Sequence, residues 1–253
     1  MSLSIGNGDV SGLYVGSQEA YKAYLGSTLV YSKELPNVSY LCNYNARNFN
    51  AATQTFVRSE NSQLFAYDLT NNVGNTGHTY TKSGGCVSLD GNYAFQHSFA
   101  DASSNPFNVD NGNTELTVIY KASFNEVGSA VSLVANRMEN TDTDWTVHKN
   151  VMNIGTGNYG EFLISTGQVA TVVIRIDNQG VLQRKWIEQN RSASGTVHTI
   201  SLDYVSDKIN FFGDIDAIQG SVVDIFMGDF YWLYISRNYL TDAQVAEVIA
   251  YNG

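Results

Sequence analysis

The fold is decided by the last stretch of the chain, residues 228–253, which reads GDFYWLYISRNYLTDAQVAEVIAYNG. Its first half is a run of aromatic and aliphatic residues, which is typical of a buried β-strand. Thr241 then stands three residues before Gln244, the spacing of a capping box at the start of a helix. Val245 and Val248 share one face of that helix. The stretch therefore predicts a long core strand followed by a short C-terminal helix.

Upstream of this stretch, short apolar runs recur with turn residues between them. Two turn signals are Asp177–Gly180 and Ser194–Gly195. Many short strands separated by turns indicate an all-β fold, a two-sheet antiparallel sandwich. The runs that we interpret as strands are 116–120, 130–135, 161–165, 169–176, 181–187, 196–202, 208–212 and 221–236.

The start of the chain repeats itself. LYVGS at Leu13–Ser17 is echoed ten residues later by AYLGS at Ala23–Ser27. Each copy is a short β-branched and aromatic run that stops at Gly-Ser, where glycine supplies the backbone angles of a tight turn. The pattern predicts a small β module that has too few residues to bury a core of its own.

A charged pair followed by a proline interrupts this module at Lys33–Pro36. We therefore divide the chain into an N-terminal β attachment module, residues 1–35, and a sandwich domain, residues 36–253. Because the module lacks a core, we expect its tyrosines to dock on a partner surface. These candidate docking residues are Tyr14, Tyr21, Tyr24 and Tyr31.

The charge of the chain argues against anionic partners. It has 14 basic and 24 acidic residues, a net charge of −10, and no more than two cations stand together, at Arg184–Lys185. Binding to phosphate backbones or anionic lipid surfaces needs clustered cations. We therefore expect no nucleic-acid partner, and because no apolar run approaches the roughly 18 to 20 residues of a membrane span, no membrane insertion.

The cysteines and the first residues bear on the compartment. Cys42 and Cys86 form neither a CxxC pair nor a secreted-type framework, which favours buried free thiols over one disulfide. Met1–Asn7 carries no basic region and no apolar region of a signal peptide. We expect synthesis and assembly in a cytoplasm.

Three stretches resemble the concanavalin A-like, laminin-G-like jelly-roll superfamily. They are VSLDGNYAF at Val87–Phe95, TELTVIYKASF at Thr114–Phe124 and the closing stretch at Gly228–Gly253, which is the most specific of the three. The resemblance covers about residues 40–253. It implies two curved antiparallel sheets, often with a glycan or protein site on the concave face or rim loops, and sometimes a calcium ion.

The opening module resembles the short YVGS…YLGSTLVY repeats of bacteriophage tail, fibre and other virion proteins, particularly those of phages from gut bacteria. This resemblance covers only about thirty residues. It implies a virion protein assembled in the host cytoplasm, which docks on other virion subunits through residues 1–35. A homo-oligomer is expected; a trimer would suit a fibre, but no sequence feature fixes the number.

None of the enzymatic motifs considered below is supported by the sequence. Laminarinase-type jelly rolls place their carboxylates as Glu-x-Asp-x-Glu, and no glutamate here has an aspartate two positions later. Gly155–Gly160 matches GxGxxG, but a strand pattern follows it, so we interpret it as a hairpin turn. The four histidines stand far apart, without metal-ligand spacing. We expect no catalytic residues, although carboxylates from different strands could still pair.

One segment leaves two interpretations open. Asp142 and Asp144 alternate before Trp145, so their oxygens could bind calcium or sugar hydroxyls while the indole stacks on a pyranose ring. Alternatively, the aspartates belong to a solvated loop and Trp145 starts a core strand. Asp214–Asp216 is ambiguous in the same way, between a site and an ordinary turn.

The sequence as a whole favours a non-enzymatic phage virion structural protein, a fibre, tail or capsid decoration component. It presents a lectin-like sandwich that could adhere to host or mucus glycans near Trp145. The alternatives are a carbohydrate-binding lectin module of a bacterium and a polysaccharide depolymerase with an unrecognised carboxylate pair.

Overall fold

A computed structural model describes most of the chain after residue 39, and before it only six short strands. Contacts divide the chain into two units, residues 39–240 and residues 1–38 with 241–253. The described ranges after residue 39 are 40–53, 55–56, 73–74, 81–91, 93–109, 114–126, 131–137, 143–155, 157–197, 206–216 and 221–253.

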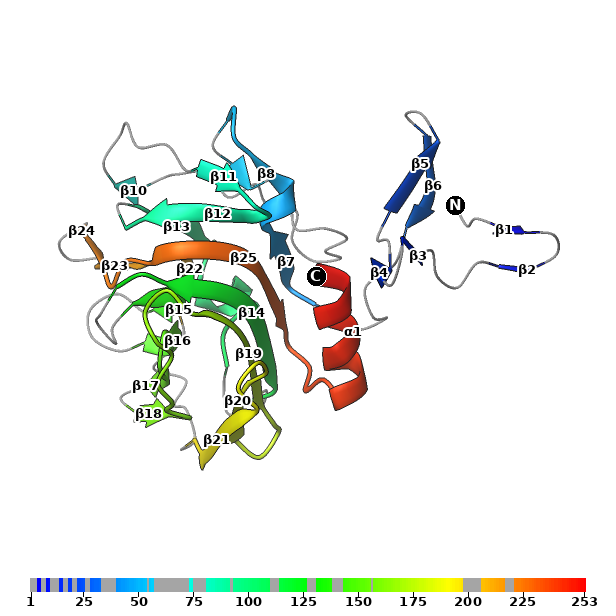
Figure 1. Cartoon of the computed structure of the whole chain (residues 1–253). Coiled ribbons are helices and arrows are strands. Elements are labelled where there is room, and N and C mark those ends of the chain that lie inside the picture. Colours follow the sequence, from blue (N-terminus) through cyan, green and yellow to red (C-terminus); the bar gives the residue numbers. More distant parts are fainter. Residues whose placement is uncertain are drawn as a thin grey trace. The chain divides into compact units, whose positions relative to one another are not determined.

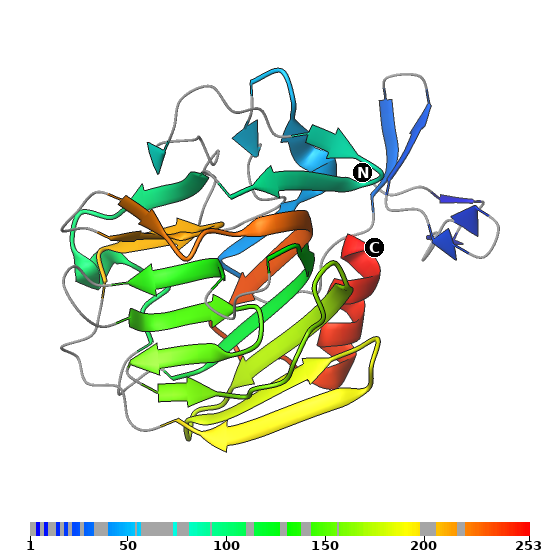
Figure 2. The same ribbon diagram turned by 60° about the vertical axis from the view of Figure 1, so that its left-hand side comes forward.

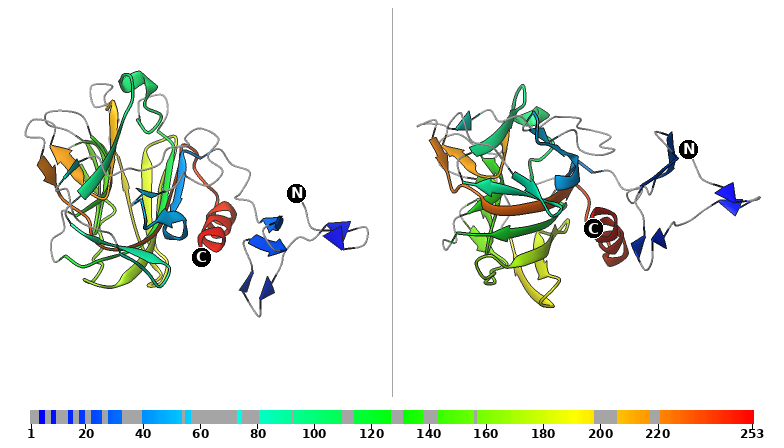
Figure 3. Two further views of the ribbon diagram at one scale, coloured as in Figure 1. Left: turned by 90° about the horizontal axis from the view of Figure 1, so that it is seen from above. Right: turned by 45° about the horizontal axis from the view of Figure 1, so that its top comes forward.

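Within these ranges, residues 39–240 form two large antiparallel sheets, which face each other in Figures 1 and 3. Both sheets contain strands from distant parts of the sequence. One is a seven-stranded sheet in the order β10 (Val73–Gly74), β13 (Tyr93–Ser98), β22 (Lys208–Phe211), β15 (Ser132–Arg137), β16 (Thr143–His148), β17 (Met152–Gly155) and β18 (Gly157–Tyr159).

The second sheet, also seen in Figure 2, has eight strands among the described residues. Seven follow one another in order, and the eighth, β7, pairs with the second half of β25, whose first half pairs with β12. Its order is β11 (Thr81–Ser83), β12 (Cys86–Asp90), β25 (Met227–Ser236), β14 (Leu116–Phe124), β19 (Val169–Ile176), β20 (Val181–Trp186) and β21 (Arg191–Thr196), with β7 (Cys42–Asn45) beside β25.

Smaller elements complete this unit. They are the strand pairs β8 (Phe49–Asn50) with β9 (Thr55–Phe56) and β23 (Asp214–Asp216) with β24 (Ser221–Val223), and the short 3-10 helices at Ala46–Asn48 and Ala102–Ser104. The two-sheet antiparallel sandwich predicted from the turn spacing is thus confirmed.

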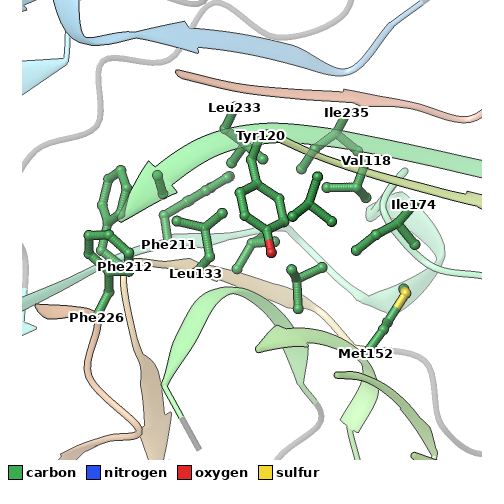
Figure 4. Close-up of a cluster of buried hydrophobic side chains, with 14 of the residues drawn as sticks. Val118, Tyr120, Leu133, Met152, Ile174, Phe211, Phe212, Phe226, Leu233 and Ile235 are labelled. Carbon is green, nitrogen blue, oxygen red and sulfur yellow. The ribbon is translucent and has the colours of Figure 1, made fainter. Parts of the chain in front are cut away.

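The hydrophobic core lies between the two sheets (Figure 4). Side chains of a strand alternate between its two faces, so every second residue of β14, Val118, Tyr120 and Ala122 among them, points into the core. Leu133 and Phe211 meet them from the seven-stranded sheet. Because burying one such large side chain contributes roughly 1.5–3 kcal/mol, this layer stabilises the sandwich.

The cysteines lie in this unit, Cys42 in β7 and Cys86 in β12, and both are buried free thiols, as the sequence predicts. No described helix is long and apolar enough to span a membrane.

Some predicted strands differ from the observed ones only in their bounds, such as 130–135 against β15 and 116–120 against β14. Residues 161–165 form no strand; the amides of Phe162 and Ile164 bond instead to Asn150. Of the run 196–202, Thr196 is the last residue of β21, and residues 198–202 lie outside the described part of the chain. Ser194–Gly195 lies inside β21 and forms no turn.

The run 221–236 is also split, into β24 and β25. The break falls at Asp224, whose φ of 48° is left-handed and interrupts the strand. Asp177–Gly180 does form the predicted turn, in which the Asp177 carboxylate accepts from the amides of Gln179 and Val181.

The second unit contains α1 (Asp242–Asn252), and its start confirms the sequence pattern. The Thr241 hydroxyl accepts from the Gln244 amide at 3.3 Å, and the Gln244 side chain accepts from the Thr241 amide at 2.9 Å. This capping box satisfies backbone groups that a helix leaves open at its first turn.

The described strands before residue 33 form three antiparallel hairpins. They are β1 (Ser4–Ile5) with β2 (Gly8–Asp9), β3 (Tyr14–Val15) with β4 (Gln18–Glu19), and β5 (Lys22–Leu25) with β6 (Thr28–Ser32). The innermost pairs are Ile5 with Gly8, Val15 with Gln18, and Leu25 with Thr28. Each hairpin therefore has two connecting residues, and the hairpins recur every ten residues.

The sequence analysis found two of these three copies. The connecting residues read Gly-Asn, Gly-Ser and Gly-Ser, and glycine at the first of two loop residues is a hairpin signal. Tyr14, Tyr24 and Tyr31 lie in the strands, but their side chains are outside the described part, as is Tyr21 altogether. Docking through these tyrosines stays a prediction.

Candidate polar site on the seven-stranded sheet

The segment predicted to bind a glycan is placed differently by the structure. Trp145 is completely buried in β16, and its indole Nε1 donates to the Phe107 carbonyl oxygen at 2.7 Å. An indole that packs in the core presents no face to a sugar, which corrects the stacking interpretation and leaves Trp145 as a core residue. Asp142 lies outside the described residues, and of Asp144 only the backbone, in β16, is described.

Two other motifs singled out in the sequence form regular secondary structure. Gly155 ends β17 and Gly157 starts β18, and the two strands pair, so the GxGxxG match is the predicted hairpin. Asp214–Asp216 is strand β23 rather than a turn. Among the described residues, no group of three or more His, Cys, Asp or Glu side chains could hold a metal ion.

A polar row crosses the seven-stranded sheet from β13 to β18. Its members are cross-strand partners, each facing the next on the neighbouring strand. In order they are Gln96, Asn210, Ala135, Thr146, Asn153 and Asn158, and we call this set the polar row.

The polar row faces away from the core. A second continuous row lies one residue away along each strand. We call it the core row, and its members pair across the strands in the same way. These are Phe95, Phe211, Val134, Val147, Met152 and Tyr159, all of which belong to the core cluster or pack against it. Since neighbouring residues of a strand point to opposite faces, the polar row lies on the other side of the sheet.

Two adjacent members of the polar row have spare hydrogen-bonding capacity. Thr146 on β16 and Asn153 on β17 are direct cross-strand partners. Thr146 Oγ1 and Asn153 Oδ1 are both buried and have no hydrogen-bond partner. A buried polar atom without a partner costs about 1–3 kcal/mol, so such atoms are uncommon without a role.

Exposure varies along the polar row. Thr146 is 1% exposed and Asn210 is buried as well, whereas Gln96 and Asn153 are half-buried and Asn158 is exposed. At the β13 end, Gln96 Nε2 donates to Asn210 Oδ1 at 2.9 Å and so orients that amide. The polar row is therefore most accessible at its β18 end.

His148 orients Asn153 from the same face. Its Nε2 lies 3.1 Å from Asn153 Nδ2, and its Nδ1 lies 3.3 Å from Ser132 Oγ. Because the amide Nδ2 only donates, Nε2 accepts and the imidazole proton sits on Nδ1. This tautomer holds the amide with its Oδ1 left over as an acceptor.

The His148 imidazole is neutral. Burial and, to a smaller extent, the nearby Arg184 guanidinium together lower its pKa to about 4. The hydrogen bonds of His148 and Asn153 are therefore those of an uncharged imidazole throughout the neutral pH range.

Arg184 reaches this region from the core side. It lies on β20 of the opposite sheet, is fully buried, and its Nη2 donates to the carbonyl oxygens of His148 at 3.1 Å and Lys149 at 2.8 Å, and to the Tyr120 hydroxyl at 3.2 Å. The Phe162 ring covers its guanidinium at 4.3 Å. Arg184 thus ties the end of β16 to the other sheet.

No carboxylate among the described residues pairs with Arg184, and its Nε has no partner. The contacts of its guanidinium among the described residues are carbonyl oxygens, one phenol and an aromatic face. Such a cation is costly to bury, and the hydrogen bonds to the carbonyl oxygens of His148 and Lys149 offset part of that cost.

Sequence reasoning missed the polar row, although part of its signal is legible. Trp145 and Val147 alternate with Thr146 and His148, and the same alternation continues through β17. That pattern marks one polar face. It does not give the register that aligns residues as far apart as Gln96 and Asn210, so the row appears only in the structure.

No protein-family model and no curated protein sequence matches the chain. Solved structures do resemble it. Domain 4 of AbnA, a GH43 extracellular arabinanase from Geobacillus stearothermophilus solved with arabinotriose, is similar with a TM-score of 0.54 and 12% identity, over 83% of this chain and 98% of that one.

A Trypanosoma rangeli sialidase in complex with sialic acid is similar with a TM-score of 0.59 and 8% identity, over 91% of this chain. The match covers 35% of the sialidase, so this chain spans about a third of its length. At such low identities the likeness shows the fold alone. It agrees with the two-sheet sandwich that the concanavalin A-like resemblance implies.

Proposed function

We propose that this chain is a non-enzymatic carbohydrate-binding protein whose polar row receives sugar hydroxyls. The observation that carries the proposal is the adjacent pair Thr146 and Asn153, each with an unpartnered buried oxygen. A hydroxyl of a ligand can donate its one proton to Asn153 Oδ1 while it accepts from the Thr146 hydroxyl. Both oxygens are shielded from solvent in the free protein, so neighbouring side chains at the half-buried Asn153 have to move before a ligand can satisfy these groups.

The composition of the polar row supports a sugar as the ligand. Amides and hydroxyls placed at fixed positions are the groups that orient polar ligands in binding sites. Neighbouring members of the polar row lie on strands about 4.8 Å apart, so one sugar ring can contact two of them. The similar arabinanase domain is solved with arabinotriose, which makes a glycan a natural first ligand to test.

The proposal assigns no reaction to this face. Glycoside hydrolysis uses a pair of carboxyl groups beside the scissile bond. The polar row contains no carboxylate. A depolymerase activity would need other residues, and incubation with capsular polysaccharide, followed by sizing of the chains, tests for it.

The test of binding is a glycan array followed by titration calorimetry on each hit. Thr146→Val removes the hydroxyl but keeps the shape of the side chain, and Thr196→Val makes the same change at an exposed position of β21, on the other sheet. We expect Thr146→Val to weaken binding at least tenfold and Thr196→Val to leave it unchanged. Equal affinities for all three proteins would refute a site at the polar row.

A second role rests on a separate observation, the three hairpins that recur every ten residues before residue 33. Isolated two-stranded hairpins are marginally stable in water, so such units gain stability from a neighbour. We propose that residues 1–35 attach the sandwich to virion subunits or to other copies of this chain, as the phage resemblance implies.

Deletion of residues 1–35 tests this second role. The truncated chain should fold, lose its oligomeric state in light scattering and fail to enter phage particles. Normal incorporation of the truncated chain would contradict the attachment role. It would leave a free lectin-type module as the remaining interpretation.

A further inference from the structure

We propose that the polar row selects an uncharged sugar and rejects acidic ones such as sialic acids, uronic acids and sulfated sugars. This inference rests on the proposed function and narrows its ligand class. It follows from the hydrogen-bonding groups that the polar row offers and from where the cations of the region point.

The first argument is the donor and acceptor inventory at the centre of the polar row. Asn153 Oδ1 can only accept a hydrogen bond, and it is fixed in this role because Nδ2 already donates to His148. A carboxylate or sulfate oxygen also only accepts, so Asn153 Oδ1 would repel it, and of the two unpartnered groups only the Thr146 hydroxyl could donate to it. A sugar hydroxyl donates and fits the same position.

The second argument is the state of His148. Its Nε2 is occupied by Asn153 and its Nδ1 by Ser132, so neither nitrogen is free to bind an anion. The imidazole is also neutral, because it is 6% exposed and stands near the Arg184 guanidinium. His148 therefore orients the amide and adds no positive charge to the face.

The third argument is the direction of the neighbouring cations. Arg184 approaches from the core side, where its guanidinium donates to backbone carbonyl oxygens. Lys149 Nζ donates to the Glu126 carbonyl at 2.7 Å and to Thr166 Oγ1 at 3.1 Å. Both cations are engaged elsewhere, so neither balances an anion at Asn153.

Lys208 shares the face of the polar row, two residues from Asn210 on β22. In the sheet order, β22 is three strands from β17, which places Lys208 roughly 14 Å across the sheet from Asn153 at a strand spacing of about 4.8 Å. Ionic strength screens charges over about 8 Å at physiological salt. The net charge of −10 adds further repulsion of anions.

The experiment compares matched pairs of glycans that differ only in charge. The pairs are lactose against 3′-sialyllactose, a neutral glucan against its carboxymethyl derivative, and an arabinan against a pectic galacturonan. Each is titrated against the full chain, against Thr146→Val and against Lys208→Gln. Lys208→Gln removes the cation that could rescue an acidic ligand.

We expect binding of at least one neutral member, at least tenfold weaker binding of its acidic partner, and a tenfold loss in Thr146→Val. Lys208→Gln should leave neutral binding unchanged. Acidic glycans that bind more tightly than their neutral partners and lose affinity in Lys208→Gln would overturn the charge selection while leaving carbohydrate binding intact. Absence of binding to every member of the pairs and the array would overturn the proposed function itself.

Discussion

Two rows of side chains cross the seven-stranded sheet one residue apart, and they meet opposite environments. The core row, from Phe95 to Tyr159, is filled by packing against the other sheet. The polar row, from Gln96 to Asn158, keeps buried oxygens without partners at Thr146 and Asn153. The same strands therefore serve two purposes. The core row stabilises the sandwich, and the polar row has oxygens that can still form hydrogen bonds.

The largest effect is expected in the core row. Phe211→Ala removes a ring that packs against Tyr44 and Phe107 in the core. It should lower the free energy of unfolding by about 3–5 kcal/mol, because a buried phenylalanine is lost and a cavity is left. Denaturant unfolding measures this. A loss below 1 kcal/mol would mean that the core row does not carry the stability assigned to it.

The next effect is a dependence of stability on pH through His148. The pKa of its imidazole is about 4 in the folded protein against 6.5 in the unfolded chain, so between these values only the unfolded chain takes up the proton. Stability is therefore full above about pH 6.5 and decreases as the pH falls toward 4, by roughly 3 kcal/mol in total.

The groups that face His148 are Ser132, Asn153 and, as the cations of the region, Arg184 and Lys149. Burial also lowers the pKa of His97 on β13, so the part due to His148 has to be isolated with a variant. Urea unfolding at half-unit steps of pH measures the dependence, and the difference from His148→Gln isolates it from the carboxylates. A curve for His148→Gln parallel to that of the wild type would contradict the assignment.

Arg184→Met tests the link between the two sheets at the end of β16. It leaves the Tyr120 hydroxyl and the carbonyls of His148 and Lys149 without their buried donor, so unfolding should become easier by roughly 2 kcal/mol. Because a like charge is removed, the pKa of His148 should rise. Nuclear magnetic resonance titration of the imidazole reads this directly, and an unchanged pKa would show that the guanidinium does not act on His148.

The smallest change in stability is expected for Thr146→Val. The hydroxyl has no partner in the protein, so its loss should alter the free energy of unfolding by no more than about 0.5 kcal/mol, while glycan binding falls. Calorimetric unfolding and ligand titration on the same preparation separate the two effects. A decrease of 2 kcal/mol or more in the free energy of unfolding would mean that Thr146 stabilises the fold, as the core row does.

The sequence predicts much of the sandwich because its strands carry local signals. Alternation and turn residues predict 169–176 and 181–187 closely, and the Thr241 capping box marks the start of α1. Residues 161–165 mislead because apolar alternation does not reveal whether a strand partner exists. Asp224 breaks a run that is continuous in composition, and its left-handed backbone could not be predicted because residues other than glycine seldom adopt it.

The candidate site was harder to predict than the fold. Trp145 drew attention because aromatic rings often bind sugars, but its burial depends on the 101–109 segment that accepts its N–H, and nothing near Trp145 in the sequence indicates that contact. The polar row depends on the register of six strands taken from residues 93 to 211. Register is a property of pairing, and single-sequence patterns do not contain it.

The position of β25 has a consequence for synthesis. This strand, Met227–Ser236, pairs with β7, β12 and β14, and all three precede it in the chain. Until β25 leaves the ribosome, those strands lack it as a neighbour, whereas the hairpins of residues 4–32 need only local contacts and can form as soon as they emerge. A chain truncated before residue 227 would therefore have unpaired strand edges, which favour aggregation and proteolysis.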